Sequence, residues 1–582
     1  MITFPDILEI QPLAKPPNCK VAVPGSKSIT NRALILAALL LARCNPGSAA
    51  ADVDPRLKEF AKLKHQQTEE LAAKLHLDVP PDVLEFFKAA EAGDSNSLSN
   101  SYARIQRRTG QPETSIQTPL YGNALSIPVH ETRDAYDEFR AWDGTMLQKY
   151  ADGILHSLPA GCLYFGGTDP GRFIITVVRD VAKVPNIFII TQNGLAERQY
   201  AAYLRLIYGR QLSLPTEADA EAALKEYVKN AQARQARGEQ LSPDEKIFVE
   251  GGAVQVRGVA GVMGINAILS KWVFDHNKDK HGFYVEESYE VPWMYPYLEP
   301  HGLIFKLNGE PLAQLDPAVV ERDRVFWDKL TKESLADPRF LKNDAARKTY
   351  AKLRAAIGGL YAYRHLAGEA EAVYKQAMTL CPASAEASFS LAQLYLEQNR
   401  PDDAVAVLDQ LRKFDPHNAK ISLAVQRIHA AQQANDEVKK LTVARNASPR
   451  DVRLVIQLAK DYSQLGQTEK IGPLCDSYMT QAGLSADDMF QIAQLYLSVG
   501  QTERSLATLQ LITKGFPKNP QPYYSIAIIR AFQGATDDAL TALEKAIQLS
   551  PALRDLARRD SRLANLRSNP RFQKLVSPTP SQ

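Results

Sequence analysis

Residues 385–416 read AEASFSLAQLYLEQNRPDDAVAVLDQLRKFDP, and the spacing within this stretch decides the fold of the C-terminal part of the 582-residue chain. Prolines and tyrosines recur at an interval of 34 residues. The pairs are Pro382 and Pro416, Pro517 and Pro551, Tyr361 and Tyr395, and Tyr462 and Tyr496. A fixed period of this length predicts a solenoid of paired helices. Each proline would end the second helix of a pair, because proline lacks an N–H group and clashes with the preceding turn.

Each period also places small and bulky residues at fixed positions. The small residues are Gly358, Ala370, Ala377, Ala392, Ala404, Ala527, Ala539 and Ala546, and the bulky ones are Ile357, Tyr361, Tyr374, Leu391, Tyr395, Leu408, Ile526 and Leu543. Small residues allow two antiparallel helices to approach closely, and bulky residues fill the space between them. This placement resembles the tetratricopeptide repeat (TPR) family, which implies an α-helical solenoid over residues 344–552 that binds a protein or peptide. An ordinary helical bundle is the alternative.

The resemblance also implies which side chains line the concave groove, because the first helix of each TPR pair faces it. These side chains are Phe389, Gln393, Arg453, Lys460, Phe490, Gln494, Tyr524 and Phe532. Aromatic rings beside amides favour an extended peptide with apolar anchors. The alternative occupant is the chain itself, through its middle domain or its polar connector.

The middle and the end of the array depart from the regular pattern. The repeat that follows Pro416 slips by one residue before Pro449, and its small positions are lost. Residues 553–576 form an Arg-rich amphipathic stretch, which predicts a capping helix and a tail over residues 553–582.

Composition indicates a multidomain globular protein. Hydrophobic residues make up 45% of the chain, charged residues 23%, and the formal net charge is +3. The chain is too long for one core, and its small net charge gives no reason to propose nucleic acid as a partner. Without any CxxC spacing, the cysteines indicate buried thiols rather than a disulfide framework or a zinc site, and no metal or cofactor is predicted. They are Cys19, Cys44, Cys162, Cys381 and Cys475.

The longest apolar run, residues 33–42, is too short to span a bilayer. A cytoplasmic location is therefore expected. The run follows basic residues and precedes the small residues 48–51, so export through a signal-like segment is the alternative.

Residues 20–42 read KVAVPGSKSITNRALILAALLLA, which predicts a short βα segment within residues 1–50. Backbone N–H groups at the helix start, beside Lys27 and Arg32, would suit a phosphate or a carboxylate. The PGSKSxxNR motif resembles the enolpyruvyl transferases, specifically 3-phosphoshikimate 1-carboxyvinyltransferase (EPSP synthase). The resemblance implies that Lys27 contacts phosphoenolpyruvate and shikimate 3-phosphate, and that Ser28 and Arg32 hold the latter. A shikimate-pathway transferase is therefore one alternative function, and a fused fragment is the other interpretation.

Residues 52–158 are predicted as a helical region with a polar connector. Apolar residues at helical spacing predict helices over 55–76 and 81–87. The stretch 93–128 is rich in Ser, Asn, Gly, Gln and Pro and indicates the connector. A further helix is predicted over 135–158.

Residues 159–343 are predicted as a Rossmann-like α/β domain. Apolar strands at 162–165 and 187–191 alternate with helical patterns, which favours a doubly wound parallel sheet. The GGTDPG loop follows the first strand, where such sheets bind ligands, and Asp169 and Arg172 are the candidate ligand-binding residues. The alternative is a tight turn without a ligand, since three glycines and a proline need only backbone geometry.

The densest aromatic region lies at residues 283–305, interleaved with carboxylates and a histidine. A sugar-binding or sugar-active cleft using Asp169, Glu286, Glu287 or His301 is one interpretation. Packing of the rings against a core edge or the solenoid is the other. The segments YFGGTDPGR and WMYPYLEPHGLIFKLNG resemble the soluble domain of bacterial membrane glycosyltransferase-like proteins.

The sequence therefore predicts a multidomain α and α/β protein that acts as a protein–protein interaction scaffold, with a possible role in envelope or glycan metabolism. The enolpyruvyl transferase and the sugar-active domain are the alternative functions.

Overall fold

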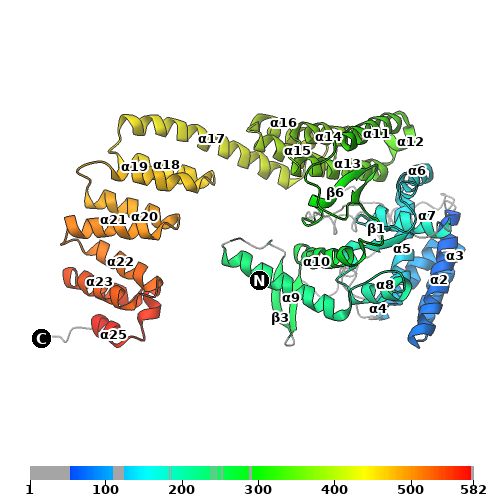
Figure 1. Ribbon diagram of the computed structural model, residues 1–582, viewed down its shortest axis with the longest axis horizontal. Coiled ribbons are helices and arrows are strands. Elements are labelled where there is room, and N and C mark those ends of the chain that lie inside the picture. The colour runs from blue at the N-terminus through cyan, green and yellow to red at the C-terminus, as the bar shows by residue number, and fades with distance from the viewer. Residues whose placement is uncertain are drawn as a thin grey trace, which may run out of the picture. The chain divides into compact units, whose positions relative to one another are not determined.

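The computed structural model describes residues 53–108, 124–182, 184, 187–237, 239, 242, 245–250, 253–286 and 291–577. The chain divides into two compact units, Met1–Asn418 and Ala419–Gln582. Helices dominate both units, and a small mixed sheet lies in the first (Figure 1). The predicted βα segment of residues 1–50 lies outside the described residues.

Five helices of the described chain precede the sheet. They are α2 (Pro55–Leu75), α3 (Pro81–Ala92), α4 (Ser95–Arg108), α5 (Ser126–Ala141) and α6 (Gly144–Leu155). Two predictions are wrong here. Helix α4 lies in the expected connector, because its many serines obscure a helical spacing of Leu98, Tyr102 and Ile105, which are buried. The helix predicted over 135–158 is two helices, because the Asp143 carboxylate caps the first N–H groups of α6.

The sheet has the strand order β2-β1-β5-β7-β6. The strands are β1 (Leu163–Gly166), β2 (Phe188–Thr191), β5 (Phe283–Glu286), β6 (Leu298–His301) and β7 (Ile304–Leu307). Strand β1 pairs in parallel with β2 and β5, so that Leu163 lies opposite Phe188 and Phe283. Because β2 lies on one side of β1 and β5 on the other, the carboxyl end of β1 is a topological switch point, where parallel sheets usually bind ligands.

The doubly wound parallel order predicted for this region is wrong beyond these three strands. Strand β7 is antiparallel to β5 and β6, and the β6–β7 turn contains Gly302 with a φ of 64°. A separate hairpin pairs β3 (Lys246–Glu250) with β4 (Ala253–Arg257). The two-residue turn between β6 and β7 can join only antiparallel strands, so this hairpin cannot extend a parallel sheet.

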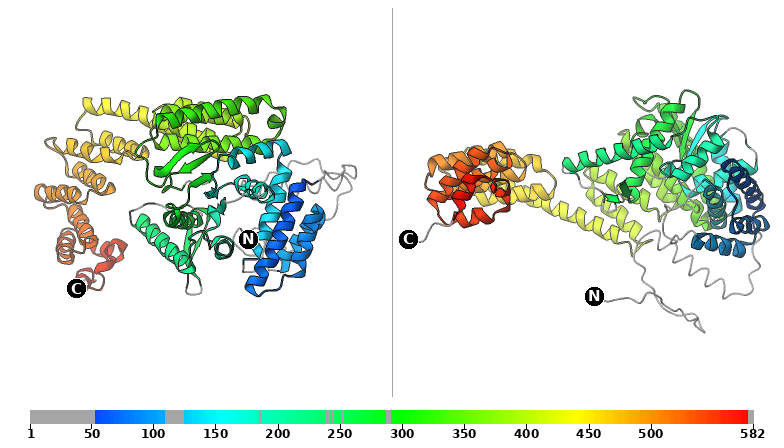
Figure 2. Two further views of the ribbon diagram at one scale, coloured as in Figure 1. Left: turned by 45° about the vertical axis from the view of Figure 1, so that its right-hand side comes forward. Right: turned by 90° about the horizontal axis from the view of Figure 1, so that it is seen from below.

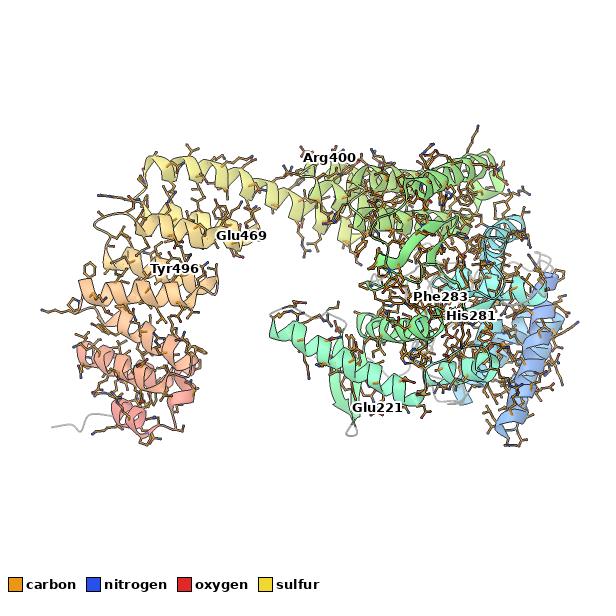
Figure 3. The ribbon with its side chains drawn as sticks, viewed as in Figure 1. Glu221, His281, Phe283, Arg400, Glu469 and Tyr496 are labelled. Atoms are coloured by element: carbon orange, nitrogen blue, oxygen red, sulfur yellow. The ribbon has the colours of Figure 1, made fainter. Side chains whose placement is uncertain are left out.

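Helices and short turns connect the strands. They are η1 (Pro170–Ile174), α7 (Ile175–Val181), η2 (Gln192–Gly194), α8 (Arg198–Tyr208), α9 (Glu217–Ala236) and α10 (Val259–Asn277). The side chain of Phe283, labelled in Figure 3, is 2% exposed. Its ring lies 5.8 Å from that of Phe165 and 5.1 Å from that of Phe274 on α10, so the core lies between the sheet and this helix.

Two helical pairs of the predicted repeat array close the first unit. They follow α11 (Pro317–Ala336) and α12 (Pro338–Lys342) and consist of α13 (Asp344–Tyr363) with α14 (Ala367–Leu380) and α15 (Ala385–Glu397) with α16 (Pro401–Arg412). Gly358 is required in the first pair, because a Cβ atom there would lie 2.7 Å from the ring of Tyr374 on the facing helix. The small and bulky positions in the sequence thus describe a real helix–helix contact.

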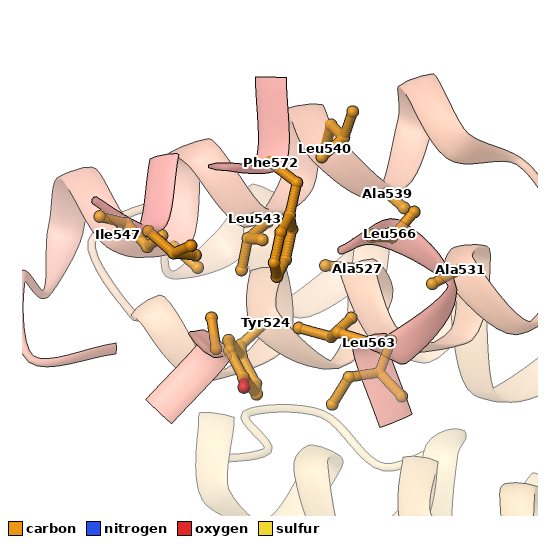
Figure 4. Close-up of a cluster of buried hydrophobic side chains, with 14 of the residues drawn as sticks. Tyr524, Ala527, Ala531, Ala539, Leu540, Leu543, Ile547, Leu563, Leu566 and Phe572 are labelled. Atoms are coloured by element: carbon orange, nitrogen blue, oxygen red, sulfur yellow. The ribbon is translucent and has the colours of Figure 1, made fainter. Parts of the chain in front are cut away.

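The second unit contains the remaining pairs and the cap. Its elements are α17 (Ala419–Ala447), α18 (Val452–Gln464), η4 (Thr468–Lys470), α19 (Ile471–Met479), α20 (Ala486–Ser498), α21 (Thr502–Gly515), α22 (Pro520–Phe532), α23 (Thr536–Leu549), α24 (Leu553–Arg559), η5 (Ser561–Leu566) and α25 (Pro570–Val576). The last three pack on α22 and α23 around one apolar cluster, shown in Figure 4. The predicted cap is therefore three short elements and not one helix.

A left-handed residue reverses the chain between the two helices of five pairs. These residues are His365, Asn399, Gly466, Gly500 and Gly534, with φ values from 58° to 75°. The interval of 34 residues separates the first two and also the last three. Adding 34 to Asn399 gives Gln433, a good helix former that disfavours the left-handed conformation.

Helix α17 runs through this position without a turn (Figure 2). Its 29 residues make a rod about 43 Å long, where a regular repeat would have a helical pair. Gln426 also stands where regular repeats place glycine or alanine, such as Gly358 and Ala392. The irregularity noted in the sequence therefore marks a repeat whose two helices are fused.

Candidate functional site

In the second unit, the first helix of each helical pair exposes most of the polar side chains that were predicted for the groove. Arg453 and Lys460 on α18 are exposed, as is Gln494 on α20. The guanidinium of Arg453 forms an ion pair with Asp451, with an N–O distance of 3.0 Å. These side chains are available to a partner without unfolding of the helices that carry them.

The predicted apolar anchors separate into buried and exposed ones. Phe490 on α20 is half-buried and packs against a cluster that includes Leu509 and Ile512. Phe532, at the end of α22, is 71% exposed. Leu497, which was not among the predicted groove residues, lies at the end of α20 and is 44% exposed. The two exposed side chains stand at almost the same position of consecutive repeats, 35 residues apart.

Tyr524 is a packing residue and does not line a groove. It is 4% exposed and lies in the C-terminal apolar cluster with Leu563 and Phe572, as Figure 4 shows. Its hydroxyl donates a hydrogen bond of 3.0 Å to the carboxylate of Asp560. The sequence pattern misplaced Tyr524, because the cap covers the face that an open repeat would leave exposed.

The second helical pair carries the other two predicted groove residues. On α15, Phe389 is half-buried, whereas Gln393 is exposed and donates a hydrogen bond of 3.0 Å to Glu397. At the turn that follows, Arg400 (Figure 3) forms an ion pair with Glu371 of α14, at 2.9 Å. Contacts with Lys375 and Arg400 lower the pKa of Glu371 to about 2.

The first helical pair is covered by the chain itself, through α11. The carboxylate of Asp323 on α11 accepts hydrogen bonds from Arg354 at 2.7 Å and from the Tyr361 hydroxyl at 2.8 Å. All three side chains are buried, and the Arg354 guanidinium lies 5.1 Å from the ring centroid of Trp327. The face of α13 that carries Arg354 and Tyr361 is therefore covered by α11 of the same chain.

Aromatic residues after β5 pack against α10 and the first helical pair. Trp293 lies 5.3 Å from Phe274, centroid to centroid, and donates a hydrogen bond of 3.2 Å to Ser270. The ring of Tyr295 lies 5.1 Å from that of Tyr363 on α13. These contacts match the packing interpretation of the aromatic run.

A buried glutamate fills the loop at the carboxyl end of β1. Glu286, the last residue of β5, is fully buried. Its carboxylate accepts hydrogen bonds from the Thr168 N–H at 2.9 Å, the Thr168 hydroxyl at 2.6 Å and the Tyr150 hydroxyl at 2.8 Å. The loop donors that could hold an external phosphate or carboxylate are thus already bound to an internal carboxylate.

Gly171 allows this arrangement, because a Cβ atom there would lie 1.6 Å from a Glu286 oxygen. The glycine in the GGTDPG loop therefore has a packing role. Its carbonyl oxygen also accepts a hydrogen bond of 3.1 Å from the Tyr164 hydroxyl on β1. The interpretation of this loop as a tight turn without a ligand accounts for these contacts.

Asp169 and Arg172 form an ion pair beside this loop. Half-buried carboxyl groups lie within electrostatic reach of Arg172, on α5 and just before α8. Burial raises the pKa of Asp134 to about 6, of Glu138 to about 8 and of Glu197 to about 7. Asp169 and Arg172 stay candidate ligand groups, since their side chains reach the surface.

Of the other sugar-site candidates, Glu286 lies beside this loop, where its carboxylate is bound internally by Thr168. His301 on β6 is hydrogen-bonded to the Ser157 carbonyl oxygen, at 2.9 Å from its Nε2 atom. Glu287, Lys27, Ser28 and Arg32 lie outside the described residues. Among the residues that the structure describes, no cluster of His, Cys, Asp or Glu could hold a metal ion.

The burial of the charged groups that organise this unit was not predicted. Asp323, Arg354 and Glu286 are charged, and the sequence pattern gives no sign that each has a buried partner far along the chain. One signal was available, because Arg354 stands among apolar positions on the inner face of a predicted repeat helix. A charge at such a position indicates a buried ion pair.

The fold of the C-terminal part defines a helical-repeat protein. Residues 365–428 match the tetratricopeptide repeat family, which confirms the TPR interpretation for this part of the chain. No curated protein matches the chain. The resemblances to enolpyruvyl transferases and to membrane glycosyltransferase-like proteins are not supported by any of these comparisons.

Solved structures that match part of the chain include MamA, at 14% identity over 34% of this chain and 96% of that one, with a TM-score of 0.16. YrrB, described as a TPR protein with an unusual peptide-binding site, is 16% identical over 39% and 92%, also with a TM-score of 0.16. A TPR protein from Parabacteroides merdae is 13% identical over 41% and 92%, with a TM-score of 0.18. Within the described residues, no helix is long and apolar enough to cross a membrane.

Proposed function

We propose that the protein is an interaction scaffold whose second unit binds an extended protein segment along the first helices of its repeats. The observation that carries this proposal is the exposure of Phe532 and Leu497 on consecutive repeats, beside the exposed amide of Gln494. Exposing such side chains to water is unfavourable, and a partner that covers them gains that free energy. The covered face of the first helical pair makes the second unit the better candidate surface.

The binding surface can be tested with the full chain and a displayed library of random 12-residue peptides. Selected peptides should lose roughly tenfold in affinity for each of Leu497→Ser and Phe532→Ser, since each removes a buried apolar contact of about 1.5 kcal/mol from the complex. Phe516→Ser is the matched control, because Phe516 is 40% exposed but lies after the second helix of its repeat. Equal losses in all three variants, or none, would contradict this surface.

A more specific proposal is that the protein has a role in envelope or glycan metabolism. It rests on the YFGGTDPGR and WMYPYLEPHGLIFKLNG segments, which resemble the soluble domain of membrane glycosyltransferase-like proteins. Asp169 and Arg172 are the groups it assigns to a sugar or acidic ligand. A glycan array probed with the full chain and with Asp169→Ala tests it. Binding that Asp169→Ala leaves unchanged, or no binding to any glycan, would count against it.

An enolpyruvyl transferase activity rests on the PGSKSxxNR motif alone. Release of phosphate from shikimate 3-phosphate and phosphoenolpyruvate, abolished by Lys27→Ala, would support it. We expect no release, because the described residues form one small mixed sheet with its helices and an array of helical pairs, which differs from the two domains of repeated α/β units that such a transferase needs. A cytoplasmic location is likewise a proposal, which cell fractionation tests.

A further inference from the structure

The C-terminal cap carries a strong excess of positive charge. Between residues 553 and 576, Lys and Arg occupy seven positions and Asp occupies two. The formal net charge of the whole chain is only +3, so this concentration is hidden in the overall composition. Charge of one sign on adjacent short elements creates a local potential that attracts the opposite charge.

Both acidic residues of the cap are engaged within it. Asp555 forms an ion pair with Arg558, at 2.8 Å, on the same helix. Asp560 caps η5, forms an ion pair with Arg562 at 2.7 Å, and accepts a hydrogen bond from Tyr524. The ion pair and these hydrogen bonds lower the pKa of Asp560 to about 2, so that it stays ionised and fixed in the fold.

Three cations of the cap are left for a partner. Arg559, Arg567 and Lys574 are exposed, and no ion pair is found for them among the described residues. The guanidinium of Arg567 donates a hydrogen bond of 3.4 Å to the main-chain oxygen of Asp560. Arg571, in contrast, is paired with Glu544 of α23, at 2.8 Å.

The fold directs these cations outward. The large apolar side chains of α24, η5 and α25, with the exception of the exposed Leu556, pack in or against the cluster of Figure 4, and α24 packs against α25. Leu553, Leu563 and Phe572 are each at most 8% exposed. The inward face is thus filled, and the charged side chains of all three elements form the outer face of the cap.

We propose that this outer face binds an acidic protein segment. Arginine forks bind carboxylates through paired, charge-assisted hydrogen bonds. The surface lies on the cap and uses none of the residues assigned above to the repeat faces, so the two sites can be tested separately.

The side chains of the cap disfavour two other anionic partners. Single-stranded nucleic acid binds on exposed aromatic rings, and Phe572, the only aromatic residue from 553 to 576, is 2% exposed. Insertion into a membrane needs an apolar helical face, and Leu556, at 48%, is the one large apolar residue of the cap that is strongly exposed. An acidic protein segment needs neither feature.

Fluorescence anisotropy with a labelled 12-residue poly-glutamate peptide tests the proposal on the full chain. Binding should weaken about tenfold when Arg559, Arg567 and Lys574 are all replaced by Ser, because three exposed ion pairs are lost. It should also weaken as salt is raised from 50 to 200 mM. The matched control replaces Arg322, Lys332 and Lys342 of α11 and α12 by Ser, which lowers the net charge equally at exposed positions.

Loss of binding in the cap variant alone supports the proposal. An equal loss in the control variant, or no binding at 50 mM salt, overturns it. Tighter binding of single-stranded RNA or of anionic vesicles through the same three residues overturns the assignment to protein. Circular dichroism should show unchanged helix content in both variants, since all six side chains are exposed.

Discussion

The pair α13–α14 and the pair α20–α21 share one sequence pattern but differ in what covers them. On the first pair, α11 buries Arg354 and Tyr361 against Asp323. In the second unit, Gln494 and Leu497 on α20 stay exposed. A repeat pattern therefore fixes how two helices pack on each other, whereas the neighbouring element decides whether their outer face is a core or a binding surface.

The largest expected effect on stability is at the buried Arg354, in comparison with the exposed Arg453. Arg354→Met should lower the free energy of unfolding of the first unit by about 3–5 kcal/mol, because it leaves Asp323 buried without its partner. Denaturant unfolding followed by tryptophan fluorescence reports this unit alone, since all four tryptophans lie between residues 142 and 327.

Arg453→Met is the matched control, and it should cost less than about 1 kcal/mol, because its ion pair with Asp451 is exposed. Its effect falls in the second unit, which hydrogen exchange of α18 amides measures. Pairing Arg354→Met with Asp323→Leu should recover much of the loss. Equal losses of unfolding free energy in Arg354→Met and Arg453→Met would contradict the difference between a covered helical pair in the first unit and an open one in the second.

A smaller effect on stability is expected when a glycine of each unit is replaced by alanine, which adds one methyl group. Gly358→Ala should cost about 1–3 kcal/mol, because its Cβ atom would press on the ring of Tyr374. Gly515→Ala, at the end of α21, meets no atom within 4 Å and should change stability by less than about 1 kcal/mol. Thermal unfolding of both variants checks the contrast, and a destabilised Gly515→Ala would contradict the open surface there.

The two units should also respond to pH in opposite directions. Burial raises the pKa of Glu138 to about 8, so its contribution to the first unit is lost as pH rises from about 4.5 to 8. The pKa of Asp560 is lowered to about 2, so its contribution to the second unit is lost as pH falls from about 4 to 2.

Substitutions at these two carboxyl groups test the assignment. Glu138→Gln should flatten the decrease in stability between pH 5 and 8 by about 1–2 kcal/mol, and Asp560→Asn should flatten the decrease below pH 4 by a similar amount. Tryptophan fluorescence follows the first and hydrogen exchange of α22 the second. If Glu138→Gln left the profile above pH 5 unchanged, the raised pKa of this half-buried carboxyl group would be refuted.

The smallest expected effect on stability is at Phe532. Phe532→Ser should change the unfolding free energy by less than about 0.5 kcal/mol, because the ring is 71% exposed. The variant should nevertheless lose peptide binding, so stability and binding are separated at one residue. A large loss of stability would show that the ring is covered.

Much of the array could be predicted, because repeat packing is local and periodic. The interval of 34 residues located the helical pairs, and Gly358 with Tyr374 predicted a close helix–helix contact that the structure confirms. Gln433 could also have been recognised in the sequence, since it replaces the left-handed residue that the other pairs need. The fused helix α17 follows from that one position together with the lost small residues.

The middle region was harder to predict, because its decisive contacts join residues far apart in the chain. Glu286 lies 118 residues after Thr168, whose N–H and hydroxyl it binds. The sequence left both a cleft and packing open for the aromatic run, and the contacts of Trp293 with Phe274 and of Tyr295 with Tyr363 match packing. The antiparallel half of the sheet was missed, since short strands such as β6 contain few alternating residues.

By itself the sequence determined the paired helices, their turns and their end at Pro551, because small residues, left-handed turn residues and prolines act on their immediate neighbours. Only the tertiary structure decided that Arg354 and Glu286 are buried, that the cap encloses Tyr524 and that Phe532 stays exposed. Burial of a side chain depends on which distant element lies over it, and local spacing carries no information about that element.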